Sequence, residues 1–368
     1  MASIPIGAGL GIAVGNSGST KSAAEWSRGL TPSDIPALWF ANVTFPISSA
    51  TCDAYSITES TAAATSGRAA RTFALPVSVG GTPHGLSVRS DAILLTTSEQ
   101  AGAPNPINFY ESVFVLSTSA SGNLTEGDVT RVLSGELFGG TQSMRAVGTF
   151  DDGSIVLASG TGFITHVTLA QLLENDWSEL PPIWNANRSL GFDCVTVPNS
   201  HRVWLRNLDD LLLYDLDSPT GAILPIKNAK GSNFGAFGGF MAMSAEGGLH
   251  VVRELANSMD VAYFAPALLN ALTPTQSNPA PTRVLTSPEF PPNYDDGVSI
   301  YAIDTDAAGG AWIGEYRWDS TGEVRALHFS PQAMSEGGSQ MPDRIITRPS
   351  GPFFSIVRHA PGFGLFQR

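Results

Sequence analysis

A unit of two apolar strands joined by a short polar turn recurs along the chain. Its copies are SVRSDAILLTTS (87–98), GTFDDGSIVLAS (148–159), VTVPNSHRVWLR (195–206), AMSAEGGLHVVR (242–253), AIDTDAAGGAWIGE (302–315) and IVRHAPGFGLFQ (356–367). The turn residues supply the positive φ that a tight hairpin requires, and the flanking residues alternate or run apolar as buried strands do. Each copy therefore predicts a β-hairpin.

A third strand is predicted after each hairpin except the last, and a fourth strand follows in several copies. The third strand has the forms SVFVLST, ITHVTLA, LLLYDLD, VAYFAPA and RALHFSP, and the fourth is marked by Arg131, Arg283, Arg344 and, less clearly, Arg71. Pro266 and Pro331 open short stretches between strands three and four. They predict helical turns there, because proline at the first helical position loses no hydrogen bond. Four antiparallel strands per copy predict the blades of a β-propeller.

The two ends of the chain each supply part of one blade. The C-terminal hairpin at 356–367 has no third or fourth strand after it, whereas 36–43, 52–57 and 71–77 resemble outer strands without an innermost one. Joining them closes the ring and removes exposed sheet edges. We therefore predict an all-β propeller of six four-stranded blades closed by strands from both termini, with seven blades as the alternative.

Residues 1–33 differ in kind from the rest, because they are rich in Gly, Ala and Ser and lack strand periodicity. We expect a flexible N-terminal arm or leader at 1–33 and a propeller domain at 34–368. In an alternative interpretation, Trp26 anchors this arm on the propeller itself or on a neighbouring subunit, and in the second case the protein forms an oligomer.

The stretch TPHGLSVRSDAILLTT and the pairing of FSP with PDRIIT resemble the NHL/YVTN-type repeats of bacterial β-propeller proteins, many of which are exported. The resemblance covers most of the chain from about residue 34 onward. It implies the fold but no single activity, since such repeats occur in ligand-binding, scaffolding and enzymatic propellers. The chain departs from the usual repeat, because the Asp-Gly turn is intact only at Asp152-Gly153.

Composition narrows the choice of partners. The 368 residues carry 33 acidic and 20 basic side chains, a net charge of −13, and only three lysines. This charge repels phosphate backbones, so we expect no nucleic-acid partner. No run of apolar residues reaches the ~18 positions of a membrane span, so we expect no such span either. The acidic, lysine-poor composition favours an extracellular or cell-surface location, although IPIGAGLGIAVG lacks the basic residues of a signal peptide.

Candidate binding residues are expected where the loops between blades gather at one mouth of the central channel. These loops and the ends of the second strands supply the candidate ligand-binding residues His84, Arg145, Asp193, Asp296 and Arg206. The other histidines are single. We interpret His166, His250 and His328 as strand residues, and His201 and His359 as residues in or near hairpin turns on the opposite face.

A second set of residues predicts a metal site at the same mouth. Asn42, Glu99, Glu254 and Glu315 stand at the ends of second strands. A ring of carboxylates with an asparagine suits Ca²⁺, which takes six to eight oxygen ligands. Six-bladed lactonase-like propellers hold a metal in this way.

The sequence favours a binding function over catalysis. It contains neither an HExxH motif nor a GxSxG nucleophile turn. We therefore predict a non-catalytic binding or structural module without a cofactor, with a protein or glycan partner on the loop face. The alternative is a metal-dependent hydrolase or lyase with its site at the channel mouth and one divalent cation, for which calcium fits best.

Overall fold

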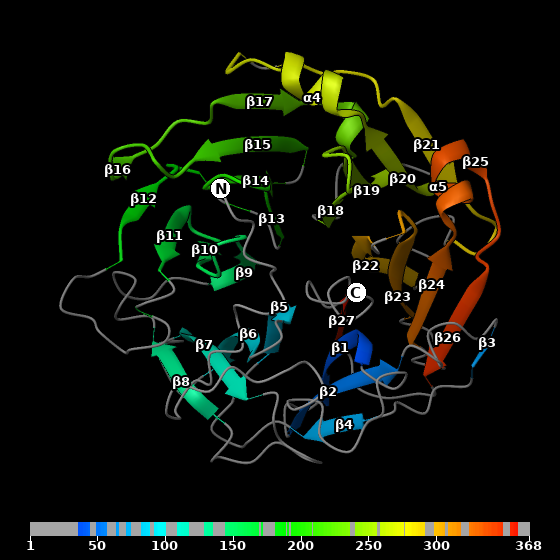
Figure 1. The fold of residues 1–368 in the computed structure, drawn as a ribbon, viewed down its shortest axis with the longest axis horizontal. Helices are drawn as coiled ribbons and strands as arrows, with labels where there is room; N and C mark the ends of the chain where they lie inside the picture. Colours follow the sequence, from blue (N-terminus) through cyan, green and yellow to red (C-terminus); the bar gives the residue numbers. More distant parts are fainter. Residues whose placement is uncertain are drawn as a thin grey trace.

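The computed structural model describes the strands between residues 36 and 134 and, with short gaps, residues 144–348 and 354–359, with side chains between residues 146 and 347. Its strands pair into antiparallel sheets that stand around a central axis (Figure 1). The predicted all-β propeller is thus confirmed. The arm predicted at residues 1–33 lies outside the described residues. Among those residues, no helix has the length and apolar character needed to cross a membrane.

In sheets 1 and 2 the structure describes the strands but not their side chains. Sheet 1 joins the two ends of the described chain, because its innermost strand comes from the C-terminal region and its other strands from the N-terminal region. In order from the centre, sheet 1 contains β27 (Phe354–His359), β1 (Pro36–Thr44), β2 (Ser49–Ser56) and β4 (Arg71–Ala74). Sheet 2 contains β5 (Thr82–Val88), β6 (Ala92–Gln100), β7 (Phe109–Ser117) and β8 (Val129–Ser134).

Sheets 3 to 6 are four blades whose side chains are also described, with gaps. Sheet 3 contains β9 (Met144–Thr149), β10 (Ile155–Ser159), β11 (Phe163–Val167) and β12 (Ile183–Asn185). Sheet 4 contains β13 (Cys194–Thr196), β14 (Arg202–Asn207), β15 (Asp210–Asp215) and β17 (Lys227–Lys230). Sheet 5 contains β18 (Met241–Met243), β19 (Leu249–Leu255), β20 (Ser258–Phe264) and β21 (Arg283–Thr286). Sheet 6 contains β22 (Val298–Thr305), β23 (Ala311–Arg317), β24 (Val324–Phe329) and β26 (Arg344–Arg348).

Local sequence signals agree with these elements. The hairpin turns of sheets 3, 5 and 6 contain Gly153, Gly247 and Gly309 at φ of 84°, 85° and 92°, where side-chain-bearing residues are strained. Helices α4 (Pro266–Ala271) and α5 (Pro331–Glu336) begin at the predicted prolines, and a short 3₁₀ helix, η4 (Ser232–Phe234), follows β17. In the C-terminal hairpin predicted at 356–367, the first strand is β27, which pairs with β1, and residues 360–367 lie outside the described part.

Short segments cover the outer edges of several sheets. Each segment belongs to the connection between the third and fourth strands of the next sheet along the ring. They are β16 (Gly221–Ala222) on β12, β25 (Gly338–Ser339) on β21, β3 (Ala64–Thr65) on β26, and a bridge from Ser277 to Ala229 of β17. The connections thereby cover strand edges that would otherwise invite intermolecular pairing, and they tie neighbouring sheets together.

The apolar core lies between the faces of neighbouring sheets. Val156, Ile164 and Trp184 of sheet 3 belong to one buried cluster with Val203 and Leu212 of sheet 4. Two comparable clusters join sheet 4 to sheet 5 and sheet 5 to sheet 6. Because both faces of a blade are covered, all five residues of β10 are buried, which explains why its first four residues are all apolar.

Ion pairs between second and third strands hold the loops that enter sheets 5 and 6. In sheet 5, Arg253 binds both carboxylate oxygens of Asp260 at 2.7 Å and donates to the carbonyl of Asn233 at 3.0 Å. In sheet 6, Arg325 binds Glu315 at 2.8 and 3.0 Å and the Glu289 carboxylate at 2.8 Å. Asn233 and Glu289 lie in the connections that arrive from the preceding sheets. Each arginine therefore fixes its own blade to the incoming chain.

We predict that Glu315→Gln lowers the free energy of unfolding by about 3 kcal/mol, because the Arg325 charge stays buried with part of its neutralisation removed. The side chain of Glu315 is 0% exposed. Urea unfolding at neutral pH measures the change. Glu336→Gln, on the exposed side of α5, is the matched control and should stay within about 0.5 kcal/mol of wild type. Equal effects of the two substitutions would contradict the proposed role of the pair.

We also predict a pH dependence that originates at His250 in β19. Burial, with a contribution from the charge of Arg283, lowers the pKa of this imidazole to about 4. In the unfolded chain the group titrates near about 6.5, so the unfolded state takes up a proton first as the pH falls. The free energy of unfolding is therefore unaffected by this group above about pH 6.5. It falls by on the order of 3 kcal/mol as the pH decreases towards about 4.

His250→Phe tests this assignment, because phenylalanine keeps a ring against Tyr263, whose ring centroid lies 4.8 Å from that of His250. Urea unfolding of both proteins at several pH values between 7 and 4 gives the difference in stability. We expect wild type to lose more stability than the variant across this window. Parallel curves would show that His250 does not carry the effect.

Candidate functional site

Two of the predicted ligand-binding residues are enclosed between blades. Asp193 accepts hydrogen bonds from the amides of Cys194 at 3.0 Å and Met241 at 2.9 Å, which links β13 to β18. Arg206 donates to the carbonyls of Phe234 and Val252. Burial, assisted by the nearby charge of Arg253, lowers the pKa of Arg206 to about 9.

The side chains of Asp193 and Arg206, which are predicted at the channel mouth, are both 0% exposed. Repeat register locates the end of a strand, but it does not decide whether a side chain turns to solvent or to the backbone of the next blade. His84 lies in β5 and Arg145 in β9, and their side chains, like the whole of Asp296, lie outside the described part. Ligand binding by these five residues stays a prediction.

The structure also describes two of the four residues predicted for the alternative calcium site with their side chains. Glu315 is paired with Arg325, and a carboxylate held by a guanidinium is a poor ligand for a second cation. Glu254 is partly buried in β19. Asn42 and Glu99 lie in β1 and β6, without described side chains. One of the three carboxylates predicted for this ring therefore has a structural partner instead.

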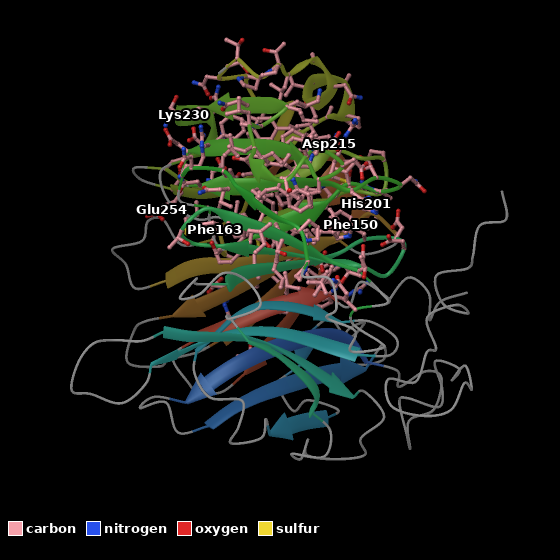
Figure 2. All side chains as sticks on the ribbon, turned by 90° about the vertical axis from the view of Figure 1, so that its left-hand side faces the viewer. Phe150, Phe163, His201, Asp215, Lys230 and Glu254 are labelled. Carbon is pink, nitrogen blue, oxygen red and sulfur yellow. The ribbon has the colours of Figure 1, made fainter. Side chains whose placement is uncertain are left out.

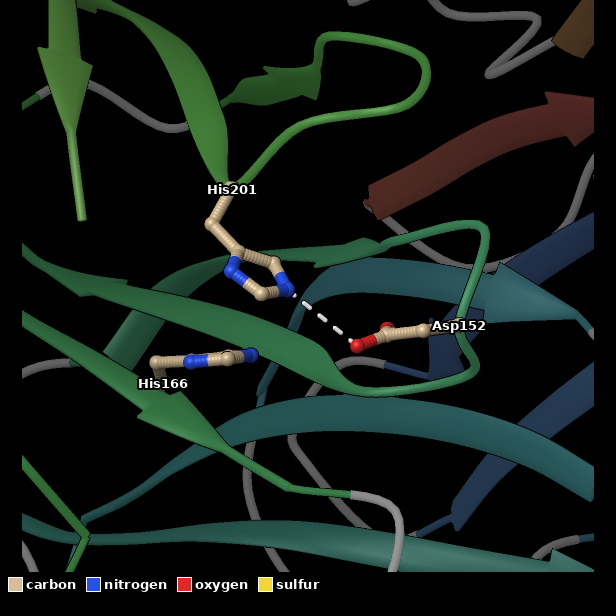
Figure 3. Close-up of side chains that lie close together, drawn as sticks. All are labelled: Asp152, His166 and His201. Carbon is tan, nitrogen blue, oxygen red and sulfur yellow. Dashed lines mark hydrogen bonds and ion pairs between the residues drawn. The ribbon is translucent and has the colours of Figure 1, made fainter. Parts of the chain in front are cut away.

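A different group of side chains meets on the opposite face, where the first hairpin turns of sheets 3 and 4 lie side by side. Figure 2 places Phe150 and His201 on one side of the ring and Glu254 on the other. Asp152 belongs to the β9–β10 turn, His166 to β11, and His201 to the β13–β14 turn. One potential ligand atom from each of the three residues lies within 4.8 Å of the others (Figure 3). We call this group the turn-face cluster.

Backbone geometry sets the positions of the two turns. Gly153 takes a positive φ, and its amide donates to the carbonyl of Phe150 at 2.9 Å, which closes the β9–β10 turn. In the β13–β14 turn, Asn199 has a φ of 55°. Its amide donates to the Asp151 carboxylate at 2.6 Å. This bond fastens the turn of sheet 4 to that of sheet 3, so His201 is held beside Asp152.

Both ring nitrogens of His201 face carboxylates. Nε2 lies 3.2 Å from Oδ2 of Asp152, and Nδ1 lies 2.9 Å from Oδ1 of Asp217. The hydrogen bond with Asp217 is the largest cause that raises the pKa of His201, and Asp152 adds to it. Burial acts to raise the pKa of Asp152, but its hydrogen bonds with Ser154 and His201 prevail and lower it. The cluster therefore combines an imidazolium that is favoured at His201 with a carboxylate, that of Asp152, whose charged form is favoured as well.

His166 occupies a more enclosed place in the cluster. Its Nε2 lies 2.7 Å from the hydroxyl of Ser154, which itself donates to Asp152 at 2.6 Å. The ring of Phe150 meets those of His166 and His201 edge-on, with centroid separations of 5.4 Å each. Burial and the charge of His201 both lower the pKa of His166. At neutral pH this imidazole is accordingly held neutral.

The repeat explains part of this arrangement. The penultimate residue of the third strand is His166 in sheet 3, and the matching positions of the next three sheets are Tyr214, Tyr263 and His328. Tyr263 donates to Glu246 in the first turn of its own sheet at 2.7 Å, as His166 contacts Ser154. Sheets 3 and 5 thus share a contact between the third strand and the first turn, and the added feature of sheet 3 is the approach of His201 from the neighbouring blade.

Sequence reasoning did not identify this cluster. Its members are separated by 14 and 35 positions and match no metal-binding motif. The usable signal was the repeat register, which places the first turn and the end of the third strand on one face and brings the turns of adjacent blades together. The prediction that His201 lies in a turn on the opposite face is confirmed.

No protein-family model matches the chain, and no curated protein matches it either. Solved structures similar to it include apo AztD from Citrobacter koseri, with a TM-score of 0.43 and 10% identity over 89% of this chain and 98% of that one. A quinonprotein alcohol dehydrogenase-like protein from Bacteroides thetaiotaomicron gives 0.44 and 11%, over 90% of this chain and 79% of that one.

A WD40 domain from Toxoplasma gondii coronin gives a TM-score of 0.39 and 8% identity, over 73% of this chain and 59% of that one. At such identities the likeness concerns the propeller fold alone, and the resemblance to NHL-type repeats stays a prediction.

Proposed function

We propose that this chain is a six-bladed β-propeller that acts as a binding module, and that its ligand binds at the turn-face cluster. The supporting observation is the convergence of Asp152, His166 and His201 from two adjacent blades within 4.8 Å. The pairing of the described strands into six sheets supports this blade count. At the other end of the ring, Asp193, Arg206 and Glu315 contact the scaffold, so the turn face is the better candidate for a ligand.

The ligand of this face is cationic, or presents a cationic group. The carboxylates of Asp152 and Asp217 have side chains that are 53% and 71% exposed, and Asp151 lies in the same turn as Asp152. Such a gathering of negative charge attracts cations and repels anions. A module of this kind binds without chemistry of its own. The acidic, lysine-poor composition supports a location outside the cell.

A thermal-shift panel tests the proposal with calcium, zinc, a polyamine, a guanidinium compound and neutral oligosaccharides as probes. A ligand that binds only the native state raises the melting temperature by mass action. We expect at least one cationic probe to raise it by several degrees, and the double variant Asp152→Asn/Asp217→Asn to lose that rise.

Asp343→Asn is the matched control, because Asp343 pairs with His328 at 2.6 Å in a similar Asp–His contact away from the turn-face cluster. It should keep the rise measured from its own baseline. If no cationic probe shifts the melting temperature, or if the shift survives in the double variant, the turn face is not the ligand face.

A further inference from the structure

We propose that the turn-face cluster binds a divalent transition-metal ion of the zinc class, with Asp152, His166 and His201 as its protein ligands. This inference rests on the proposed function and names the ligand of the same site. It differs in both place and chemistry from the calcium ring expected at the channel mouth.

The donor set selects the class of metal. Two imidazole nitrogens and one carboxylate oxygen suit Zn²⁺ and its first-row neighbours, whereas Ca²⁺ and Mg²⁺ prefer sites made of oxygen atoms. Three protein ligands also leave the fourth position of a tetrahedral ion open to water or to a group of a partner. The cluster thus matches the composition of an accessible zinc site.

The distances are compatible with small side-chain adjustments. Bonds of about 2.1 Å place two ligands of a tetrahedral zinc ion roughly 3.4 Å apart. The ligand atoms of the cluster lie within 4.8 Å of one another. The required approach is therefore at most about 1.4 Å. Asp152 and His201 project from turns and have side chains that are 53% and 35% exposed, so rotation of these two side chains can supply it.

The surroundings resemble those that orient metal ligands. Asp217 contacts Nδ1 of His201 at 2.9 Å and leaves Nε2 directed at Asp152. A histidine that binds metal through one nitrogen commonly contacts a carboxylate through the other, which fixes its ring and tautomer. Phe150 packs edge-on against both imidazole rings. Asp217 is therefore assigned as a positioning residue for His201.

Metal binding at this place would connect two blades. Asp152 and His166 belong to sheet 3, whereas His201 belongs to sheet 4. The Asp151–Asn199 hydrogen bond already joins the same two turns at 2.6 Å. A bound ion would add a second link across this junction, and binding should accordingly raise the stability of the full chain.

The test uses the full-length chain, treated with a chelator and dialysed, then titrated with Zn²⁺ by calorimetry. Co²⁺ serves as an optical probe of coordination. We expect one Zn²⁺ per chain and a visible Co²⁺ spectrum that indicates nitrogen ligands. His201→Gln and Asp152→Asn should each remove this binding. Asp217→Asn should weaken it by roughly 10- to 100-fold and leave the stoichiometry unchanged. Asp343→Asn should bind as wild type does.

This assignment is wrong if zinc does not bind wild type at one ion per chain. It is also wrong if zinc binds His201→Gln and Asp152→Asn as tightly as it binds wild type. The proposed function would survive if another cation shifted the melting temperature in a manner dependent on Asp152 and Asp217. If a variant fails to fold, histidine NMR signals of wild type decide the matter. Zinc must shift the ring resonances of His166 and His201 and leave those of His328 in place.

Discussion

The ring depends on arginine–carboxylate pairs that join the second strand of a blade to the third and also hold the chain arriving from the blade before. Arg253 with Asp260 and Arg325 with Glu315 are the two instances with described side chains. Each pair is buried and each arginine also binds the incoming connection, at Asn233 or at Glu289. Because a buried charge is costly unless it is neutralised and hydrogen-bonded, these contacts strongly favour one position of each blade relative to its neighbour.

Because of this constraint, the polar side chains on the two faces of the ring have different roles. At the end where blades are linked, polar side chains such as Asp193 and Arg206 bind backbone groups of the next sheet. On the other face, hairpin turns such as the one at Gly153 are closed by backbone hydrogen bonds of their own, so some of their side chains are available for a ligand. The turn-face cluster occurs at that second end, where the turns of sheets 3 and 4 are fastened through Asp151 and Asn199.

Much of the fold could be predicted because its signals are local and repeated. The glycine at position 153 and the prolines at 266 and 331 act within a few residues, and the structure places a turn and two helix starts at these positions. The pairing of β27 with β1 could be inferred from the incomplete sets of strands at the two ends. The short edge segments, such as β16 on β12, could not, because Gly221 and Ala222 carry no pattern of a strand.

The sequence by itself determined the class of the fold, the order of the strands within each blade and the positions of the hairpin turns, since alternating apolar residues and turn-forming residues act over short distances. Only the tertiary structure decided which polar residues are buried and which meet. Glu315 faces Arg325 within one sheet, whereas His201 reaches Asp152 across two. Both outcomes depend on how the blades pack against each other and on the direction of the side chains at that junction. The spacing of residues along the chain specifies neither of them.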